Sequence, residues 1–194
     1  MKKKTARTDG RRQRSEASRE RILRALLELI ETGDVSPRAE EVAARAGVGL
    51  RTVFRHFDNM ESLYRELSSQ MAREVMPIVE PPFRAGSLRE QLHEMMDRRT
   101  RIFERIMPFK IAADVHRHGS PFLKRQMVML TRAQREMLVA ILPAAQRKDA
   151  NFVESLDLAM SFDTWRRLRK DQKLTVPKAR RVLEHLVSAL VASD

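Results

Sequence analysis

The sequence predicts an all-α protein, with a three-helix head at the N-terminus followed by a larger helical bundle. The 194 residues, of which 42% are hydrophobic, are enough to bury a sizeable core. Only 6 glycines and 8 prolines are present, too few for a loop-rich β-sandwich. Apolar residues recur at helical spacing in about nine segments, and no segment has the pattern of a strand.

The N-terminal segment 1–16 has no apolar periodicity and is predicted to be a flexible basic arm. Ser18 is the expected N-cap of a first helix, and Gly33 its expected end. Capping and breaker residues divide the chain after Gly33: Ser36-Pro37 starts a second helix, Gly47 ends it, and Pro77 ends a fourth. The helices expected in this part are 18–32, 37–46, 49–57 and 61–76.

The larger region opens with Ser87 and Glu90, which are spaced as a capping box. Pro108 predicts a new, short helix, and Ser120-Pro121 repeats the signal for a helix start. The helices expected here are 87–106, 108–117, 121–142, 151–170 and 176–192. The predicted organisation is therefore an arm (1–16), a head (17–62), a connecting helix (63–77) and a larger domain (87–194).

The charge distribution indicates an anionic partner. The formal net charge is +12, and ten basic residues but only three acidic ones lie before residue 25. The chain has no cysteine, no apolar run long enough to cross a membrane and no signal-peptide pattern, so a cytoplasmic protein is expected. No catalytic motif or set of metal ligands is recognisable, which predicts neither an enzyme, nor a metal site, nor a cofactor.

A helix-turn-helix is predicted around the connection Gly47-Val48-Gly49, which is short enough to make a sharp corner between two short helices. On a helical wheel, Leu50, Val53, Phe54 and Phe57 form one apolar sector. The opposite, outward sector contains Arg51, Thr52, Arg55 and His56, side chains that can contact bases or phosphates in a major groove. An ordinary amphipathic helix with a solvated cationic side is the alternative.

Several segments in fixed order resemble the N-terminal domain of tetracycline-repressor-like (TetR family) regulators. They are Ser18-Arg19-Glu20-Arg21-Ile22-Leu23, Glu41-Val42-Ala43, Ala46-Gly47-Val48, Thr52-Val53-Phe54-Arg55-His56-Phe57 and Glu61-Ser62-Leu63. The resemblance implies a DNA-binding head and a body that binds a ligand and dimerises. The expected DNA-binding residues are Arg19, Arg38, Leu50, Arg51, Thr52, Phe54, Arg55 and His56.

Two positions depart from the family pattern, which commonly has tyrosine where this chain has Phe54 and lysine where it has Met60. Neither side chain present here can hold a phosphate. We therefore expect the basic arm, through Arg11, Arg12 and Arg14, to supply phosphate contacts, as arms of other helix-turn-helix proteins do. A solubilising tail is the alternative interpretation of the arm.

The resemblance also places a ligand pocket and a dimer interface in the body. The pocket candidates are Met96, Phe103, Met127 and Trp165, whose side chains favour a small, apolar effector, although such residues are more often plain core. The last two helices are expected to pair across a two-fold axis. The residues expected in that interface are Leu156, Met160, Leu183, Leu186 and Leu190.

The sequence therefore predicts a dimeric transcriptional repressor that binds a palindromic operator in double-stranded DNA and is released by a small effector. The alternative is an architectural or adaptor DNA-binding protein with the same head and no small-molecule ligand. A basic bundle that binds membrane surfaces is a third interpretation, favoured by the late cluster of Arg and Lys between Arg166 and Arg181.

Overall fold

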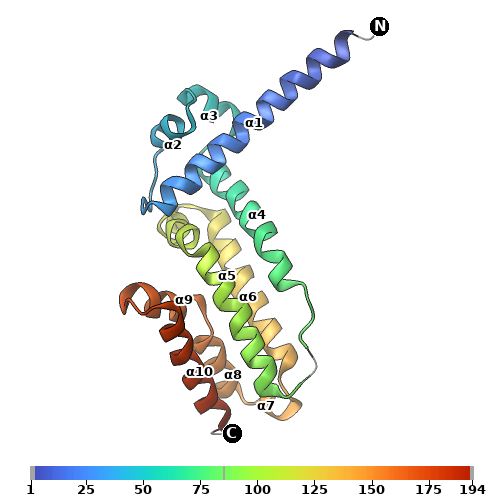
Figure 1. The fold of residues 1–194 in the computed structure, drawn as a ribbon, viewed down its shortest axis with the longest axis vertical. Coiled ribbons are helices and arrows are strands. Elements are labelled where there is room, and N and C mark those ends of the chain that lie inside the picture. Colours follow the sequence, from blue (N-terminus) through green and yellow to red (C-terminus); the bar gives the residue numbers. More distant parts are fainter. Residues whose placement is uncertain (1–2, 85, 193–194) are drawn as a thin grey trace. The chain divides into compact units, whose positions relative to one another are not determined.

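The chain folds into α-helices joined by short turns (Figure 1). The structure is a computed structural model that describes residues 3–84 and 86–192, apart from the side chains of residues 3–9 and 11. No strand occurs in these two ranges. The predicted all-α class is confirmed.

The described residues pack as two compact units. The first contains the chain up to Arg73 together with Pro108–Lys124, and the second contains Glu74–Met107 together with the chain from Arg125 onward. The long helices α4 (Met60–Val79), α5 (Leu88–His116) and α6 (Pro121–Ile141) each contribute to both. The segment 108–124, expected in the larger domain, thus belongs to the same unit as the head.

Helix α1 (Lys3–Glu31) begins well before the expected start at Ser18. The Ser18 hydroxyl donates to the carbonyl of Arg14 at 3.0 Å, as it does inside a helix, and does not cap one. The residues expected to form a flexible arm are therefore helical, in keeping with the many lysine, arginine, alanine and glutamine residues there, which are good helix formers. Gly33, at φ 101°, ends the helix in the left-handed conformation, as predicted.

The next two helices are short, α2 (Ala39–Ala46) and α3 (Leu50–His56). Arg38, and not Ser36, is the N-cap of α2: the Glu41 carboxylate accepts a bond from the Arg38 backbone N–H at 2.7 Å. The boundaries of α3 and the turn at Gly47 agree with the prediction.

The core of the first unit lies where α1 crosses α2 and α3. The side chains buried there come from every helix of the head, and their burial supplies the main stabilisation. They include Ile22, Leu26, Ile30, Val42, Ala43, Val53, Phe57, Leu63 and Leu67.

Two prolines expected to end helices lie inside them. α4 continues past Pro77 to Val79, and α5 continues past Pro108 to His116. The cost of a proline within a helix is about 3 kcal/mol. In α5 this cost is offset because Met107 and Ala112, on either side of Pro108, are both buried.

The C-terminal part is divided more finely than predicted, into α7 (Ala144–Lys148), α8 (Ala150–Ala159), α9 (Phe162–Arg166) and α10 (Val176–Ala192). One helix was expected over 151–170, but Ser161 starts a new one by accepting a bond from the Thr164 N–H at 3.2 Å. A π-helical turn, Arg167–Asp171, follows α9. The bounds of α10 agree with the prediction.

Arg99 joins three helices inside the second unit. Its guanidinium donates to the carbonyls of Gln134 on α6 at 2.5 Å and of Met160, next to α8, at 3.2 Å. Asp157 lies 3.9 Å away. Burial lowers the pKa of Arg99 to about 10, so the side chain stays charged at neutral pH. Arg99 therefore links α5 to α6 and to the end of α8.

Helix α4 holds the segment 108–124 within the first unit. The Tyr64 ring packs against Phe109 and His116, with ring centroids 6.2 and 4.7 Å apart. The Ser120 hydroxyl donates to the Glu61 carboxylate, which holds the Glu61 pKa below its ordinary value. The Tyr64 hydroxyl, by contrast, is buried with no hydrogen-bond partner among the described residues, and burial raises its pKa.

Replacing Tyr64 by phenylalanine tests this environment. A buried hydroxyl without a partner opposes folding, so Tyr64→Phe should leave the free energy of unfolding unchanged or raise it by up to about 2 kcal/mol. Leu67→Ala, at a fully buried position of the same helix, should cost about 2–5 kcal/mol. Denaturant unfolding measures both, and a loss above about 1 kcal/mol in Tyr64→Phe would show that the hydroxyl has a partner.

Candidate nucleic-acid interface

The corner between α2 and α3 depends on Gly47. Its φ of 63° and ψ of 40° place it in the left-handed region, which glycine adopts at little cost. The backbone N–H groups of Gly47 and Val48 bond to carbonyls of the last turn of α2, at 3.2 and 3.0 Å. These bonds end α2 and direct the chain into α3 within three residues.

Two side chains fix α3 on the head. Val53 is fully buried and Phe57, directly after the helix, is 3% exposed. The Arg19 guanidinium lies 4.8 Å from the centre of the Phe57 ring and forms an ion pair with Glu66 at 2.8 Å. Arg19, expected to contact DNA, is therefore engaged inside the head, where it links α1 to α4.

The outward surface of α3 is both cationic and apolar. Arg51 and Arg55 are exposed and have no ion-pair partner in the described part of the chain. Leu50 and Phe54 are 37% and 46% exposed, so the helical wheel was wrong to group them with the buried Val53. Only residues one helical turn apart, Val53 and Phe57, reach the core, because α3 is a single short helix of 7 residues lying across α1 and α2.

His56 does not lie on the outward face as the wheel predicted. It is half-buried, and its Nε2 atom is buried without a hydrogen-bond partner in the described ranges. Burial, and then the charges of Arg55 and Arg19, hold the pKa of His56 below its ordinary value. The imidazole is therefore neutral at pH 7 and brings no positive charge to a phosphate.

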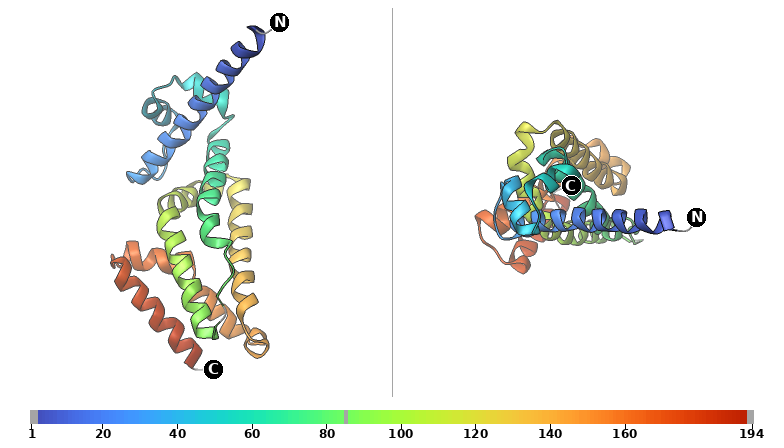
Figure 2. Two further views of the ribbon diagram at one scale, coloured as in Figure 1. Left: turned by 45° about the vertical axis from the view of Figure 1, so that its right-hand side comes forward. Right: turned by 90° about the horizontal axis from the view of Figure 1, so that it is seen from above.

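Other predicted contacts lie beside α3. Arg38, at the start of α2, is exposed and makes only a 3.4 Å ion pair with Glu41. Thr52 is half-buried near the start of α3. In both views of Figure 2, the N-terminal part of α1 projects beyond α2 and α3. Arg12 and Arg14 are exposed on this projection, whereas the Arg11 side chain lies outside the described residues.

The head matches the model of a known family. Residues 22–67 match the model of "Bacterial regulatory proteins, tetR family", a segment that contains the whole α2–Gly47–α3 corner. The match identifies 22–67 as a DNA-binding domain of the tetR type. Proteins of this family are transcription regulators and not enzymes, so the match supports the prediction of a DNA-binding regulator.

Two solved structures of transcriptional regulators share the fold. A transcriptional regulator from Rhodococcus sp. Rha1 is 20% identical, with a TM-score of 0.65, over 90% of this chain and 96% of that one. A TetR-family transcriptional regulator from Mesorhizobium loti MAFF303099 is 18% identical, with a TM-score of 0.60, over 93% of this chain and 98% of that one. No curated protein matches the sequence.

The residues predicted for a ligand pocket lie in the second unit. Met96, Phe103 and Trp165 are buried, and the Phe103 and Phe162 rings pack edge to face at 5.5 Å. Met127 is half-buried on α6. None of the four lines either of two hollows in this unit, whose walls come mainly from α4, α5 and α10. Met96, Phe103 and Trp165 are packed as core residues. A role of the four predicted residues in binding a ligand stays a prediction.

The residues predicted for the dimer interface divide into two groups. Leu156, Met160 and Leu183 are buried inside the protomer's own second unit, so they are not free to contact a partner surface. Leu186 is 40% exposed, and Leu190 is half-buried. Sequence periodicity located the stripe on α10 but could not tell which side of it α8 covers.

The described residues contain neither a candidate metal site nor a candidate membrane-spanning helix. Among the described residues, no group of His, Asp and Glu could hold a metal ion. Within the same ranges, no helix is long and apolar enough to cross a membrane.

The pH dependence of stability tests the placement of His56. The pKa of His56 is lower in the folded state than the ordinary value of about 6.5. As the pH falls through that value, the imidazole is protonated more readily in the unfolded chain than in the folded chain, which favours unfolding. The free energy of unfolding should therefore fall between pH 7 and 5. His116, whose pKa burial also lowers, adds to the same fall.

His56→Gln should reduce this fall, and His56→Gln with His116→Gln should reduce it further. Denaturant unfolding at pH 5, 6 and 7 measures the effect. An unchanged pH dependence in the double variant would contradict the buried, neutral state of both side chains.

Proposed function

We propose that this tetR-family regulator is a dimeric repressor that reads a palindromic operator through Arg51, Thr52 and Arg55. The observation that carries the proposal is the outward surface of α3, where two exposed arginines lack ion-pair partners in the described chain and no acidic residue occurs between Gly47 and Phe57. Guanidinium groups so placed suit guanine edges and phosphates in a major groove. The exposed Leu50 and Phe54 suit contact with thymine methyl groups and sugars.

A dimer is proposed because one helix of 7 residues reads too few base pairs for useful specificity. Exposed apolar side chains on the two helices that pack together at the C-terminal end support it: Leu158 on α8 is 68% exposed, and Val182 and Leu186 on α10 are 36% and 40% exposed. We therefore move the proposed interface from Leu156 and Leu183 to these three side chains.

Release of the operator by a small molecule forms the last part of the proposal. The alternative, an architectural or adaptor protein without a ligand, predicts a body with no room for one. A hollow of about 650 Å³ in the second unit favours the ligand-controlled regulator.

Arg51→Ala tests the reading of bases. On an operator selected from random duplexes, the variant should lose discrimination at one or two base pairs per half-site, at a cost of about 1–3 kcal/mol each. Affinities for all single base-pair changes of the operator, measured for both proteins, give the comparison. A uniform loss on every sequence would mean that Arg51 contacts phosphate only.

The salt dependence of binding tests the basic extension of α1. Each cation that neutralises a phosphate contributes about 0.9 to the slope of log affinity against log salt concentration, so Arg12→Gln with Arg14→Gln should lower the slope by about 1.8. The matched control, Arg167→Gln with Lys170→Gln, removes two exposed charges of the second unit and should leave the slope unchanged. Equal slopes in wild type and the Arg12/Arg14 variant would show that the extension is solvated on DNA.

Sedimentation of Leu186→Glu tests the dimer. A buried charge without a partner should shift the protein to monomers at micromolar concentration. Val128→Glu places the same charge on a 69% exposed position of α6 and should leave the dimer intact. A wild-type protein that sediments as a monomer would refute the proposed assembly.

A further inference from the structure

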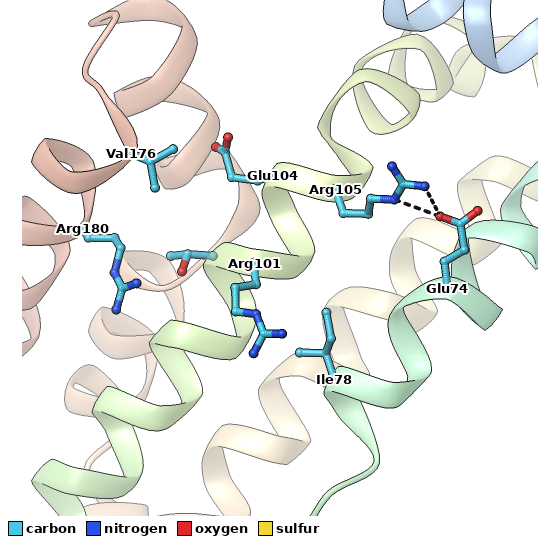
Figure 3. Close-up of a pocket in the computed structure, with 8 residues that line it drawn as sticks. Glu74, Ile78, Arg101, Glu104, Arg105, Val176 and Arg180 are labelled. Carbon is cyan, nitrogen blue, oxygen red and sulfur yellow. Dashed lines mark hydrogen bonds and ion pairs between the residues drawn. The ribbon is translucent and has the colours of Figure 1, made fainter.

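The second unit contains a hollow of about 650 Å³ between α4, α5 and α10 (Figure 3). Ile78 of α4 and Val176 of α10 give it apolar walls, and α5 contributes Arg101. A second hollow of about 660 Å³ adjoins it, because Ile78 and Arg101 line both. The size of either hollow is in the range of sites for small organic ligands.

The carboxylates that line the first hollow are paired. Glu74 accepts two bonds from the Arg105 guanidinium, at 2.9 and 2.6 Å. Glu104 accepts bonds from the Trp165 indole N–H and from Arg169, each at 2.8 Å. These ion pairs neutralise both acidic groups of the wall.

The lining arginines differ from one another. Arg105 is held by Glu74, and Arg180 pairs with Asp97. Arg101 is exposed and has neither an ion pair nor a hydrogen-bond partner within the described ranges. The two hollows thus meet at a guanidinium whose five N–H donors are available to a ligand.

We propose that this hollow binds a small organic monocarboxylate, whose carboxylate is held by the Arg101 guanidinium and whose apolar body lies against Ile78 and Val176. A planar guanidinium binds a carboxylate through two parallel N–H bonds, which makes this pairing the natural one for a lone arginine. The site is separate from the buried Met96, Phe103 and Trp165. Its role as the effector site of the regulator rests on the proposed function.

The charges of the wall set the ligand class. A polyanion such as a nucleotide would need several cations, but the other lining arginines, Arg105 and Arg180, are already paired with carboxylates. A cation would be repelled by Arg101. An uncharged apolar molecule would leave the guanidinium without a partner as it lost water. A ligand with one negative charge and an apolar body therefore matches both the Arg101 guanidinium and the apolar side chains of the wall.

The fluorescence of Trp165 can report the binding of a ligand in the hollow. Trp165 is the sole tryptophan of the chain, and its indole N–H is bonded to Glu104, a carboxylate of the wall. A ligand in the hollow changes the field around Glu104 and hence the Trp165 emission. The readout needs no DNA, so it is independent of operator binding.

The experiment titrates the full-length protein with octanoate, decanoate and 3-phenylpropanoate, by calorimetry and by Trp165 fluorescence. At least one of these carboxylates should bind saturably with one site per chain, and its uncharged amide should bind about tenfold more weakly or worse. Arg101→Gln should weaken carboxylate binding by a similar factor. The matched control Arg181→Gln removes an exposed arginine of α10 that does not line the hollow, and should bind as the wild type does.

Ile78→Asp provides a second variant, because a carboxylate in the apolar wall should repel the ligand without removing Arg101. Failure of all three carboxylates to bind, or equal affinities in wild type and Arg101→Gln, would overturn the proposal. Operator release is measured separately: a carboxylate that binds but leaves DNA bound would uphold the site and contradict its role as effector site.

Discussion

The burial of Val53 and Phe57 is the interaction on which the proposed DNA interface depends. Isolated helices need about 12–15 residues for even marginal stability in water. Helix α3 has only 7 residues, so its packing against the rest of the head must stabilise it. Because these two side chains are buried on the inner side, Arg51 and Arg55 are held outward. Gly47 allows the corner, and Arg19, stacked on Phe57 and paired with Glu66, joins α1 and α4 to the same support.

Local sequence signals predicted the head well, because its helix ends are set by local chemistry. Gly33 and Gly47 adopt the left-handed conformation that ends a helix, and this requirement is visible in the sequence. Pro108 misled the prediction because burial of Met107 and Ala112, on either side of it, is a tertiary effect that local sequence signals do not report. Pro77 misled it less, because α4 ends two residues later, at Val79. Ser161 is an N-cap within 151–170, where the apolar periodicity predicted one continuous helix.

The sequence predicted the type of each candidate site better than the residues that form it. The position of Arg51 and Arg55 on an outward face followed from helical period alone. The burial of His56 and the ion pair of Arg19 with Glu66 did not, since both depend on tertiary packing. The family resemblance placed the ligand pocket at Met96, Phe103, Met127 and Trp165, and three of these four side chains are buried in the core. The open hollow instead surrounds Arg101, whose lack of a partner appears only in three dimensions.

Hydrogen exchange of the α3 amides in the DNA-free protein tests most directly whether the core holds the recognition helix ready for DNA. The Phe57 N–H, bonded to the Val53 carbonyl at 2.9 Å, is the decisive amide. If packing alone fixes α3, this amide should open with the same free energy as the buried turns of α1 around Leu26, and it should do so only when the head unfolds. Exchange within about tenfold of the rate of an unstructured peptide would contradict the account, because α3 would then form only on DNA.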